Sequence, residues 1–350
     1  MRIISVTGYH GTGSSALIDY IKEFEDVNYI DSEVHVLVNN GGLDELNYKF
    51  NNNYSTYLLG ISISRFLRLS KCLSRFGLYG EPLDSNKLWD GYFLKRTRKF
   101  IEEITDGYQE GYSQYNLVDK RIEYKKWDMK TLPKIKKNIL KYLFFKRKTK
   151  IDDFKYGKDK IYFPKDNNVY KIAQKKYIND LFGYLYKKNK EENILFDHFF
   201  PVAAIENKND YFENSKIIVV DRDPRDIYIL NAEIWKDSFV PLNPLKFIEF
   251  YKNNRRKEIE ENKDVKKIRF EDLIYKYEET TSEIKEFLNF KEKNHKMKNK
   301  YLDVKISINN TQLFNRYSNY KKEIDVIEKE LKEYCYDFPK IDLNQNIEIF

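Results

Sequence analysis

Three glycines and two serines follow the first apolar run of the chain at a spacing suited to binding phosphate. The run 3–6 leads into the loop Gly8–Ser15, which reads Gly-Tyr-His-Gly-Thr-Gly-Ser-Ser. Glycine lets the backbone approach a ligand closely, and successive N–H groups at the start of a helix attract anions. The spacing from Gly8 to Gly13 is that of a Walker A loop, but Ser14 replaces its lysine, which disfavours an ATP-hydrolysing site. A plain strand-to-helix turn is the alternative interpretation.

A strand before this loop and a helix after it must hold the glycines in place. Apolar residues recur at helical spacing over 14–24, so one face of that helix would pack on a sheet. A second strand is expected at 27–30, and it ends at a polar segment that contains Glu33 and His35. Open α/β sheets bind ligands at the carboxyl ends of their strands, so these side chains are candidates for the same site.

Two further apolar runs deliver charged residues to the same edge. Residues 217–220, Ile-Ile-Val-Val, are typical of a central parallel strand that is buried on both faces. The segment Asp-Arg-Asp-Pro-Arg-Asp at 221–226 puts two arginines beside the strand end, which predicts a second anion site. The run at 193–196 ends in Asp-His-Phe-Phe-Pro, where Pro201 stops strand pairing because it lacks a donor N–H. We therefore expect His198 at a strand end.

The composition is that of a folded protein that carries a moderate positive charge. The 350 residues are 41% hydrophobic and include Tyr 29 and Phe 24, which excludes a disordered chain. Lys+Arg 63 against Asp+Glu 55 gives +8, which suits an anionic small ligand or an acidic glycan, although lysine-rich solvated surfaces are also common. We expect no nucleic-acid partner. The abundance of Lys, Asn, Ile and Tyr is typical of an AT-rich genome and favours a bacterial source.

Cysteine usage and hydropathy indicate a cytoplasmic protein. Cys72 and Cys335 are far apart and form no CxxC, so the sequence predicts neither a disulfide framework nor a zinc site, and we expect no metal. No run approaches ~20 apolar residues, and the chain begins with an expected core strand rather than a signal peptide.

These elements predict an α/β fold of the P-loop type, with three layers around a central parallel sheet. Residues 1–350 would form a single domain with its core in 1–38 and 170–340, and 39–169 would be a mostly helical insertion that caps the site. The expected strands are 3–6, 27–30, 193–196, 217–220 and 265–270.

Within the insertion, the stretch 134–150 combines an apolar face with many lysines. A basic amphipathic helix of this kind can lie on an anionic membrane. The alternative is an ordinary surface helix whose apolar face packs on the core.

Four segments, in order along the chain, resemble motifs of the sulfotransferase family, whose members transfer a sulfuryl group from 3′-phosphoadenosine 5′-phosphosulfate (PAPS) to a hydroxyl or amine. Residues 11–15 are similar to the family's 5′-phosphosulfate loop, and 217–226 to its 3′-phosphate motif. Residues 197–201 resemble the Thr-His-Leu-Pro segment of the cytosolic members, and 268–273 the Tyr-Glu-Asp-Leu segment. The resemblance covers about 1–35 and 170–340, and leaves the insertion unmatched.

The resemblance implies roles for individual residues. Arg222 would bind the 3′-phosphate of PAPS, or of the product 3′-phosphoadenosine 5′-phosphate (PAP), and His198 would be the catalytic base. The loop residues that would bind the 5′-phosphosulfate are Gly11, Thr12, Gly13, Ser14 and Ser15.

Two departures from the family pattern affect the site. The family's basic residue before the loop glycines falls on Gly11, with His10 as the only nearby cation candidate. The serine eight residues after the motif arginine falls on Leu230, and the adjacent Asn231 is a candidate substitute.

Several residues compete for the role of base. His198 is preferred over His10 and His35 because it ends a core strand and because imidazole titrates near neutral pH. Glu33 is the rival, since some sulfotransferases place a glutamate base after the second strand, and His35 could orient it.

The expected function is therefore sulfuryl transfer from PAPS to a glycan hydroxyl by a bacterial carbohydrate sulfotransferase. The acceptor could be a lipid-linked glycan, which the protein would reach from the cytoplasm by peripheral contact of 134–150 with the inner face of the membrane. Two alternatives stay open. One is a P-loop kinase acting on a small molecule or sugar, in which Asp221 would hold Mg²⁺. The other is a non-catalytic module that binds a nucleotide or glycan.

Overall fold

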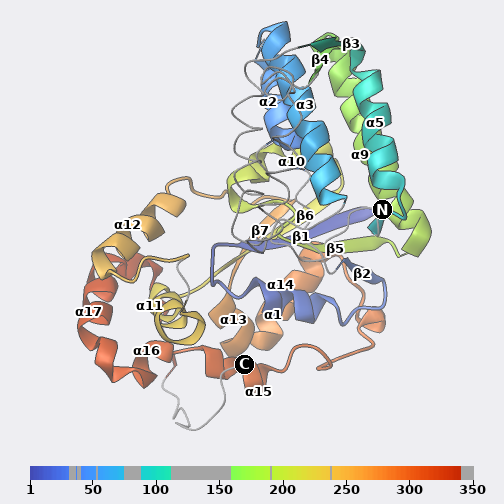
Figure 1. Ribbon diagram of the computed structural model, residues 1–350. Coiled ribbons are helices and arrows are strands. Elements are labelled where there is room, and N and C mark those ends of the chain that lie inside the picture. Colours follow the sequence, from blue (N-terminus) through green and yellow to red (C-terminus); the bar gives the residue numbers. More distant parts are fainter. Residues whose placement is uncertain are drawn as a thin grey trace, which may run out of the picture. The chain divides into compact units, whose positions relative to one another are not determined.

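The computed structural model describes residues 1–30, 37, 41–52, 54–74, 88–111, 159–189, 191–236 and 239–339. The chain divides into two compact units, one formed by Met1–His35 with Phe182–Phe350 and the other by Val36–Leu181. The first unit is built on a parallel sheet and the second mainly on long helices (Figure 1).

The sheet of the first unit has five parallel strands in the order β2-β5-β1-β6-β7. The central strand β1 has both faces buried, because Ile3, Ile4 and Val6 are all fully inaccessible to solvent. This confirms the α/β class and the central parallel sheet expected from the sequence. The strands are β1 (Arg2–Gly8), β2 (Val27–Ile30), β5 (Asn193–Asp197), β6 (Ser215–Asp221) and β7 (Val265–Arg269).

One face of this sheet packs against helices α1, α13 and α14 (Figure 1). Every second residue of β6, Ile218 and Val220, joins Leu17 of α1 and Leu273 of α13 in one hydrophobic core, as expected for side chains that alternate along a strand. The bounds are α1 (Ser14–Ile21), α13 (Phe270–Tyr275) and α14 (Tyr277–Leu288).

A second core forms among the helices that follow β6 and the C-terminal helix. Helix α11 (Pro224–Ile229) continues as a π-helix (Leu230–Trp235), and α12 (Pro244–Asn254) and α17 (Lys321–Glu330) pack against it. The short helices α10 (Lys208–Tyr211), α15 (Val304–Ser307) and α16 (Leu313–Arg316) complete this unit.

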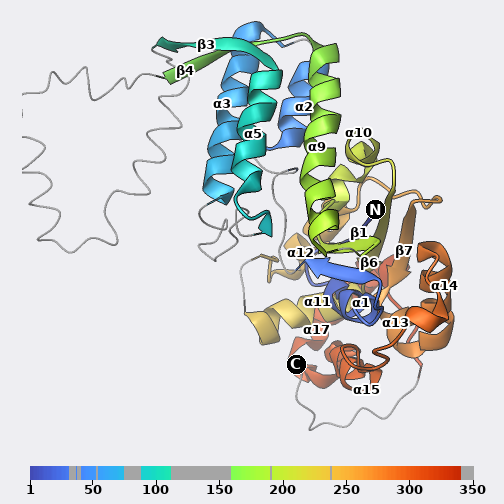
Figure 2. The same cartoon turned by 90° about the vertical axis from the view of Figure 1, so that its right-hand side faces the viewer.

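Within its described residues, the second unit contains long helices and an antiparallel hairpin (Figure 2). Buried Arg96 forms ion pairs with Asp180 and Glu103, and its guanidinium lies over the ring of Tyr177. Gly60 allows α3 to approach the hairpin, because a Cβ there would lie 2.5 Å from the carbonyl oxygen of Tyr162. The elements are α2 (Leu43–Asn51), α3 (Thr56–Leu73), α5 (Tyr92–Glu103), β3 (Thr105–Gly111), β4 (Asp159–Pro164) and α9 (Asn167–Asn189), of which α9 continues into the first unit.

The helical character expected for the insertion agrees with this unit, whereas the hairpin of β3 and β4 was not expected. The basic stretch 134–150 lies outside the described residues. Among the helices of the described part of the chain, none is long and apolar enough to cross a membrane.

Candidate functional site

The loop between β1 and α1 is held in a tight conformation that requires glycine. Gly11 and Gly13 have φ of 78° and 82°, in the left-handed region that glycine adopts without steric cost. A Cβ on Gly13 would lie 2.6 Å from the ring of Phe270, so a larger residue would displace that ring. The hydroxyl of Thr12 closes the loop by donating to the carbonyl oxygen of Tyr9 at 2.8 Å.

Several backbone donors of this loop are left over for a ligand. Within the described part of the chain, the N–H groups of Gly13, Ser14 and Ser15 meet no hydrogen-bond acceptor. The first N–H groups of a helix have no partner inside the helix, and they carry its partial positive charge. The arrangement is therefore suited to an anion at the start of α1.

Arg222 extends from the end of β6 to the same loop. Its Nη1 donates to the carbonyl oxygen of Gly11 at 3.1 Å, and its Nη2 donates to that of Asn310. The side chain lies over the ring of Phe270 and is 2% exposed, and burial lowers its pKa without discharging a guanidinium. Its Nε is buried and has no acceptor among the described residues. A buried donor without a partner is costly, so an anion at this position would be stabilised.

A cavity of about 230 Å³ joins these two features. Gly13 and Ser15 line it from the loop, and Arg222 lines it from the sheet edge. Asn310 and Ser307 from the C-terminal segment contribute polar groups on another side.

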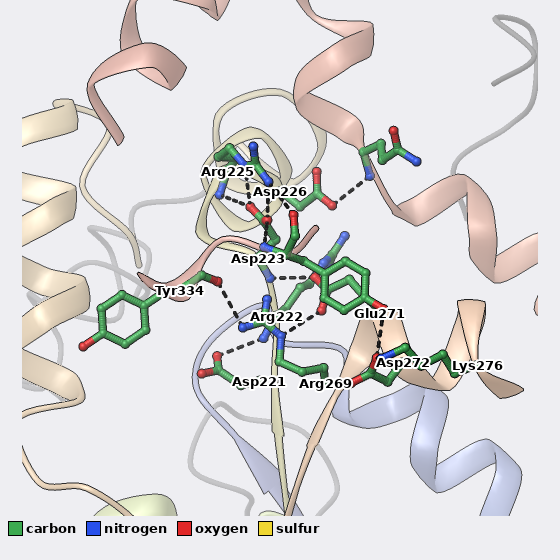
Figure 3. A network of polar contacts seen from close by, with 12 residues as sticks. Asp221, Arg222, Asp223, Arg225, Asp226, Arg269, Glu271, Asp272, Lys276 and Tyr334 are labelled. Atoms are coloured by element: carbon green, nitrogen blue, oxygen red, sulfur yellow. Dashed lines mark hydrogen bonds and ion pairs between the residues drawn. The ribbon is translucent and has the colours of Figure 1, made fainter. Parts of the chain in front are cut away.

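The remainder of the charged segment after β6 is structural rather than open to a ligand (Figure 3). Asp223 is fully buried, and its carboxylate accepts hydrogen bonds from Nε and Nη2 of Arg225 and from the N–H of Tyr336. Asp226, also fully buried, accepts the N–H groups of Gln312 and Leu313. The second arginine expected at the anion site is thus paired inside the protein.

Glu271 extends this network on the β7 side (Figure 3). Its carboxylate accepts the N–H of Asp223 at 2.6 Å and Nε of Arg269 at 3.2 Å, and it is fully buried. Burial raises the pKa of Glu271, while the neighbouring Arg269 opposes that shift. The network therefore binds the strand ends to the C-terminal segment.

Asp221 is paired with an arginine that the sequence did not single out. Its carboxylate accepts Nη2 of Arg255 at 2.6 Å and Nε at 3.3 Å. The Arg255 guanidinium also lies over the rings of Tyr9 and Tyr251, at 3.8 and 3.5 Å from their centroids. No spacing in the sequence connects positions 221 and 255, because the pair forms only when α12 packs beside the strand end. In the described residues, no group of three or more His, Cys, Asp or Glu side chains is arranged to hold a metal.

The structure brings His10 and Asn231 together beside the loop. Nε2 of His10 lies 3.1 Å from Oδ1 of Asn231, which is fully buried. Because the amide of Asn231 donates to the carbonyl oxygen of Ile227, its oxygen must accept, and Nε2 of His10 must carry the proton. The His10 ring also lies against the rings of Trp235 and Phe239.

His198 lies directly after β5, next to β1 in the sheet. Its N–H donates to the carbonyl oxygen of Val6 at 2.9 Å. Val6 is two residues before Gly8, where the loop starts, so His198 lies close to the loop. Nδ1 of His198 lies 2.5 Å from Oδ1 of Asp197, a residue to which the sequence interpretation assigned no role. Glu33, the rival base, and His35 lie outside the described residues.

Comparisons with known proteins add little to this geometry. No family model and no curated protein matches the sequence. Among solved structures, the chain resembles the crystal structure of retinol dehydratase in complex with androsterone and inactive cofactor PAP, at 11% identity and a TM-score of 0.33. The match covers 97% of this chain and 84% of that chain. At this identity and TM-score, the likeness does not indicate what this chain binds.

Proposed function

We propose that this protein is a sulfotransferase that transfers a sulfuryl group from PAPS to a hydroxyl of a glycan, releasing PAP and a sulfate ester. The observation that carries the proposal is the pairing of two unsatisfied anion-binding features at one sheet edge. One is the set of loop N–H groups at the start of α1, and the other is the buried Nε of Arg222. Both line one cavity through Gly13 and Arg222.

The residues present suit PAPS better than Mg-ATP. PAPS carries two separated anionic groups, so the loop N–H groups would hold its 5′-phosphosulfate and Arg222 its 3′-phosphate. A P-loop kinase needs a lysine in the loop and a carboxylate for Mg²⁺. Ser14 stands at the lysine position, and the carboxylate of Asp221 is already bonded to Arg255.

Chemically, the acceptor oxygen would attack the sulfur as the bond from sulfur to the phosphate oxygen breaks. The proton of the acceptor hydroxyl would pass to His198, and the leaving phosphate would take up the negative charge. The loop N–H groups and the start of α1 would stabilise that charge. His10, within the loop itself, is the candidate cation for the transferring group, and Asn231 holds its ring in place.

Exposed aromatic rings beside the loop support a sugar as acceptor. Trp235 is 42% exposed and Phe239 is 65% exposed, although both rings pack against His10. A cavity that encloses an apolar ligand would bury such rings, whereas partly exposed rings suit the flat side of a solvated sugar.

The protein would act in the cytoplasm. Residues 134–150 would contact the membrane peripherally when the glycan is lipid-linked. Co-sedimentation with anionic vesicles at low salt tests this part. If the protein stays in the supernatant, the proposed membrane contact is wrong, but the proposed sulfuryl transfer is unaffected.

Thermal melting with PAP and with Mg-ATP tests the central proposal. PAP at about a hundred times its dissociation constant should add roughly 2.7 kcal/mol of stability, and Mg-ATP should add little. Equal stabilisation by Mg-ATP would favour the kinase, and no response to PAP would exclude the sulfotransferase. Tight PAP binding without any sulfated product from PAPS and glycan acceptors would indicate a non-catalytic module.

A further inference from the structure

Asp197 and His198 are neighbours in the chain whose side chains touch, although a continued strand would keep them apart. Consecutive side chains of an extended strand point to opposite faces of the sheet. Nevertheless Nδ1 of His198 lies 2.5 Å from Oδ1 of Asp197. The backbone must therefore leave the extended conformation at this point.

His198 makes this turn by adopting a φ of 47°, in the left-handed region. Residues with a Cβ pay a steric cost there and occur at such positions mostly where the surrounding structure holds them. Two hydrogen bonds do so here. The N–H of His198 donates to the carbonyl oxygen of Val6, and the N–H of Phe200 donates to the hydroxyl of Ser5 at 3.1 Å.

The two residues after His198 anchor the turn in the core. Phe199 and Phe200 are each 1% exposed, next to a pair whose side chains are 27% and 32% exposed. Phe199 stacks on Phe196 at 4.8 Å between ring centroids and contacts Phe182 edge-on at 5.3 Å. The strained residue is thus held by buried aromatic packing on its C-terminal side and by the sheet on its N-terminal side.

The contact determines which nitrogen of His198 carries the proton when the ring is neutral. An ionised carboxylate only accepts hydrogen bonds, so Nδ1 must be the donor, and the lone pair then lies on Nε2. A carboxylate bonded to Nδ1 both orients an imidazole and stabilises the imidazolium formed when Nε2 takes a proton.

A second histidine–carboxylate pair in the same unit has the opposite arrangement. Nε2 of His295 lies 2.8 Å from Oε2 of Glu23, and the two side chains are 6% and 0% exposed. Glu23 also accepts the N–H groups of Tyr301 and Leu302. This pair is buried and fixes the chain at 295–302, whereas the pair at the end of β5 is partly exposed.

We propose that Asp197 is a positioning residue that fixes the ring orientation and tautomer of His198, so that Nε2 accepts the proton of the incoming acceptor. The inference rests on the proposed function, in which His198 is the base. It assigns a role to Asp197 that the motif resemblance did not imply.

Nitrogen NMR of the protein labelled with ¹⁵N-histidine tests the tautomer directly. At a pH where the rings are neutral, His198 should be in the Nδ1–H form and His295 in the Nε2–H form, with signals assigned by His198→Gln. In Asp197→Ala, the His198 signal should lose the Nδ1–H preference while the His295 signal is unchanged. Asp197→Glu, which retains a carboxylate, should restore it. A wild-type His198 in the Nε2–H form, or an Ala variant with the wild-type tautomer, would overturn the proposal.

Thermal melting with PAP separates this inference from the proposed function. Asp197→Ala should keep the full PAP-induced shift, because Asp197 does not line the cavity beside Arg222. A loss of that shift would mean that Asp197 shapes the nucleotide site instead, which contradicts a role confined to His198. A wild-type protein with the expected tautomers but no response to PAP would refute the sulfotransferase and leave the pairing of Asp197 with His198 established.

Discussion

Two groups of polar atoms meet at the carboxyl edge of the sheet, and they differ in how completely their hydrogen bonds are satisfied. In the network after β6, each carboxylate oxygen of Asp223 and Asp226 accepts at least one donor. At the loop, the Nε of Arg222 and the first N–H groups of α1 have no acceptor in the described chain. The satisfied group holds the strand ends to the C-terminal segment, and the unsatisfied one is the place for a ligand.

The largest expected effect is on the satisfied network. Asp226→Ala would strand the buried N–H groups of Gln312 and Leu313, so we expect a loss of about 3 to 5 kcal/mol in the free energy of unfolding. Urea unfolding measures it. Asp325→Ala, on the exposed side of α17, is the control and should change stability by less than about 0.5 kcal/mol. A similarly small loss for Asp226→Ala would show that the network is not holding the fold.

The next largest effect concerns turnover rather than stability. His198→Ala should lower kcat by about a hundredfold or more, equivalent to roughly 2.7 kcal/mol, because a general base is removed. Turnover of PAPS with a glycan acceptor measures it, and an unchanged PAP-induced melting shift shows that the nucleotide site is intact. Near-normal turnover in this variant, together with an inactive Glu33→Gln, would move the role of base to Glu33.

Arg222 belongs to both groups, so replacing it should affect both ligand binding and stability. Arg222→Ala should weaken PAP binding by roughly 1.5 to 3 kcal/mol, the range for hydrogen bonds to a charged group. Calorimetric titration with PAP measures it. The bonds to Gly11 and Asn310 predict some loss of stability as well.

Arg222→Lys is the matched variant for this position. Lysine retains the charge but lacks the planar guanidinium that bonds to the carbonyl oxygens of both Gly11 and Asn310. The PAP affinity of this variant should therefore fall between those of the wild type and Arg222→Ala. Equal PAP affinity in all three proteins would mean that Arg222 serves the fold alone.

The sequence predicted the features that depend on a local pattern of residues and missed those that depend on contacts between distant segments. The five strands were found because strands of a buried parallel sheet are nearly continuous apolar runs, such as 217–220. The loop was found because closely spaced glycines and two serines follow an apolar run, and Gly11 and Gly13 do adopt the positive φ values that glycine allows. Local pattern was sufficient for both, since neither depends on distant residues.

Contacts between distant segments could not be predicted from the sequence. Arg225 was expected to bind an anion, but its partners include Asp223 and Tyr336, and the latter is 111 positions away. Arg255 gave no signal because its partner Asp221 is brought to it by the packing of α12. The pairing of Asp197 with His198 depends on a left-handed turn that is held by hydrogen bonds to β1 and by buried phenylalanines.

The smallest expected effect tests whether a partly exposed ion pair behaves like the buried network. Asp264 lies between Lys208, 3.2 Å away, and Lys216, 3.5 Å away. Burial alone would raise the pKa of Asp264, but the hydrogen bonds and charges of the two lysines outweigh it and hold the pKa below its ordinary value of about 3.8. A carboxyl whose pKa is lowered in the folded state stabilises the fold above its ordinary pKa, and that contribution is lost as the pH falls through the folded value.

Asp264→Asn should therefore cost about 0.5 to 1 kcal/mol at pH 7 and almost nothing at pH 2, when urea unfolding is compared at the two pH values. Because Asp264 and Lys216 are each 21% exposed, 1 M salt should also reduce the cost at pH 7. The cost of Asp226→Ala should be nearly the same in low and high salt, since it comes from buried backbone donors that salt does not reach. Equal salt dependence in the two variants would contradict the distinction between a buried, satisfied network and a partly exposed ion pair.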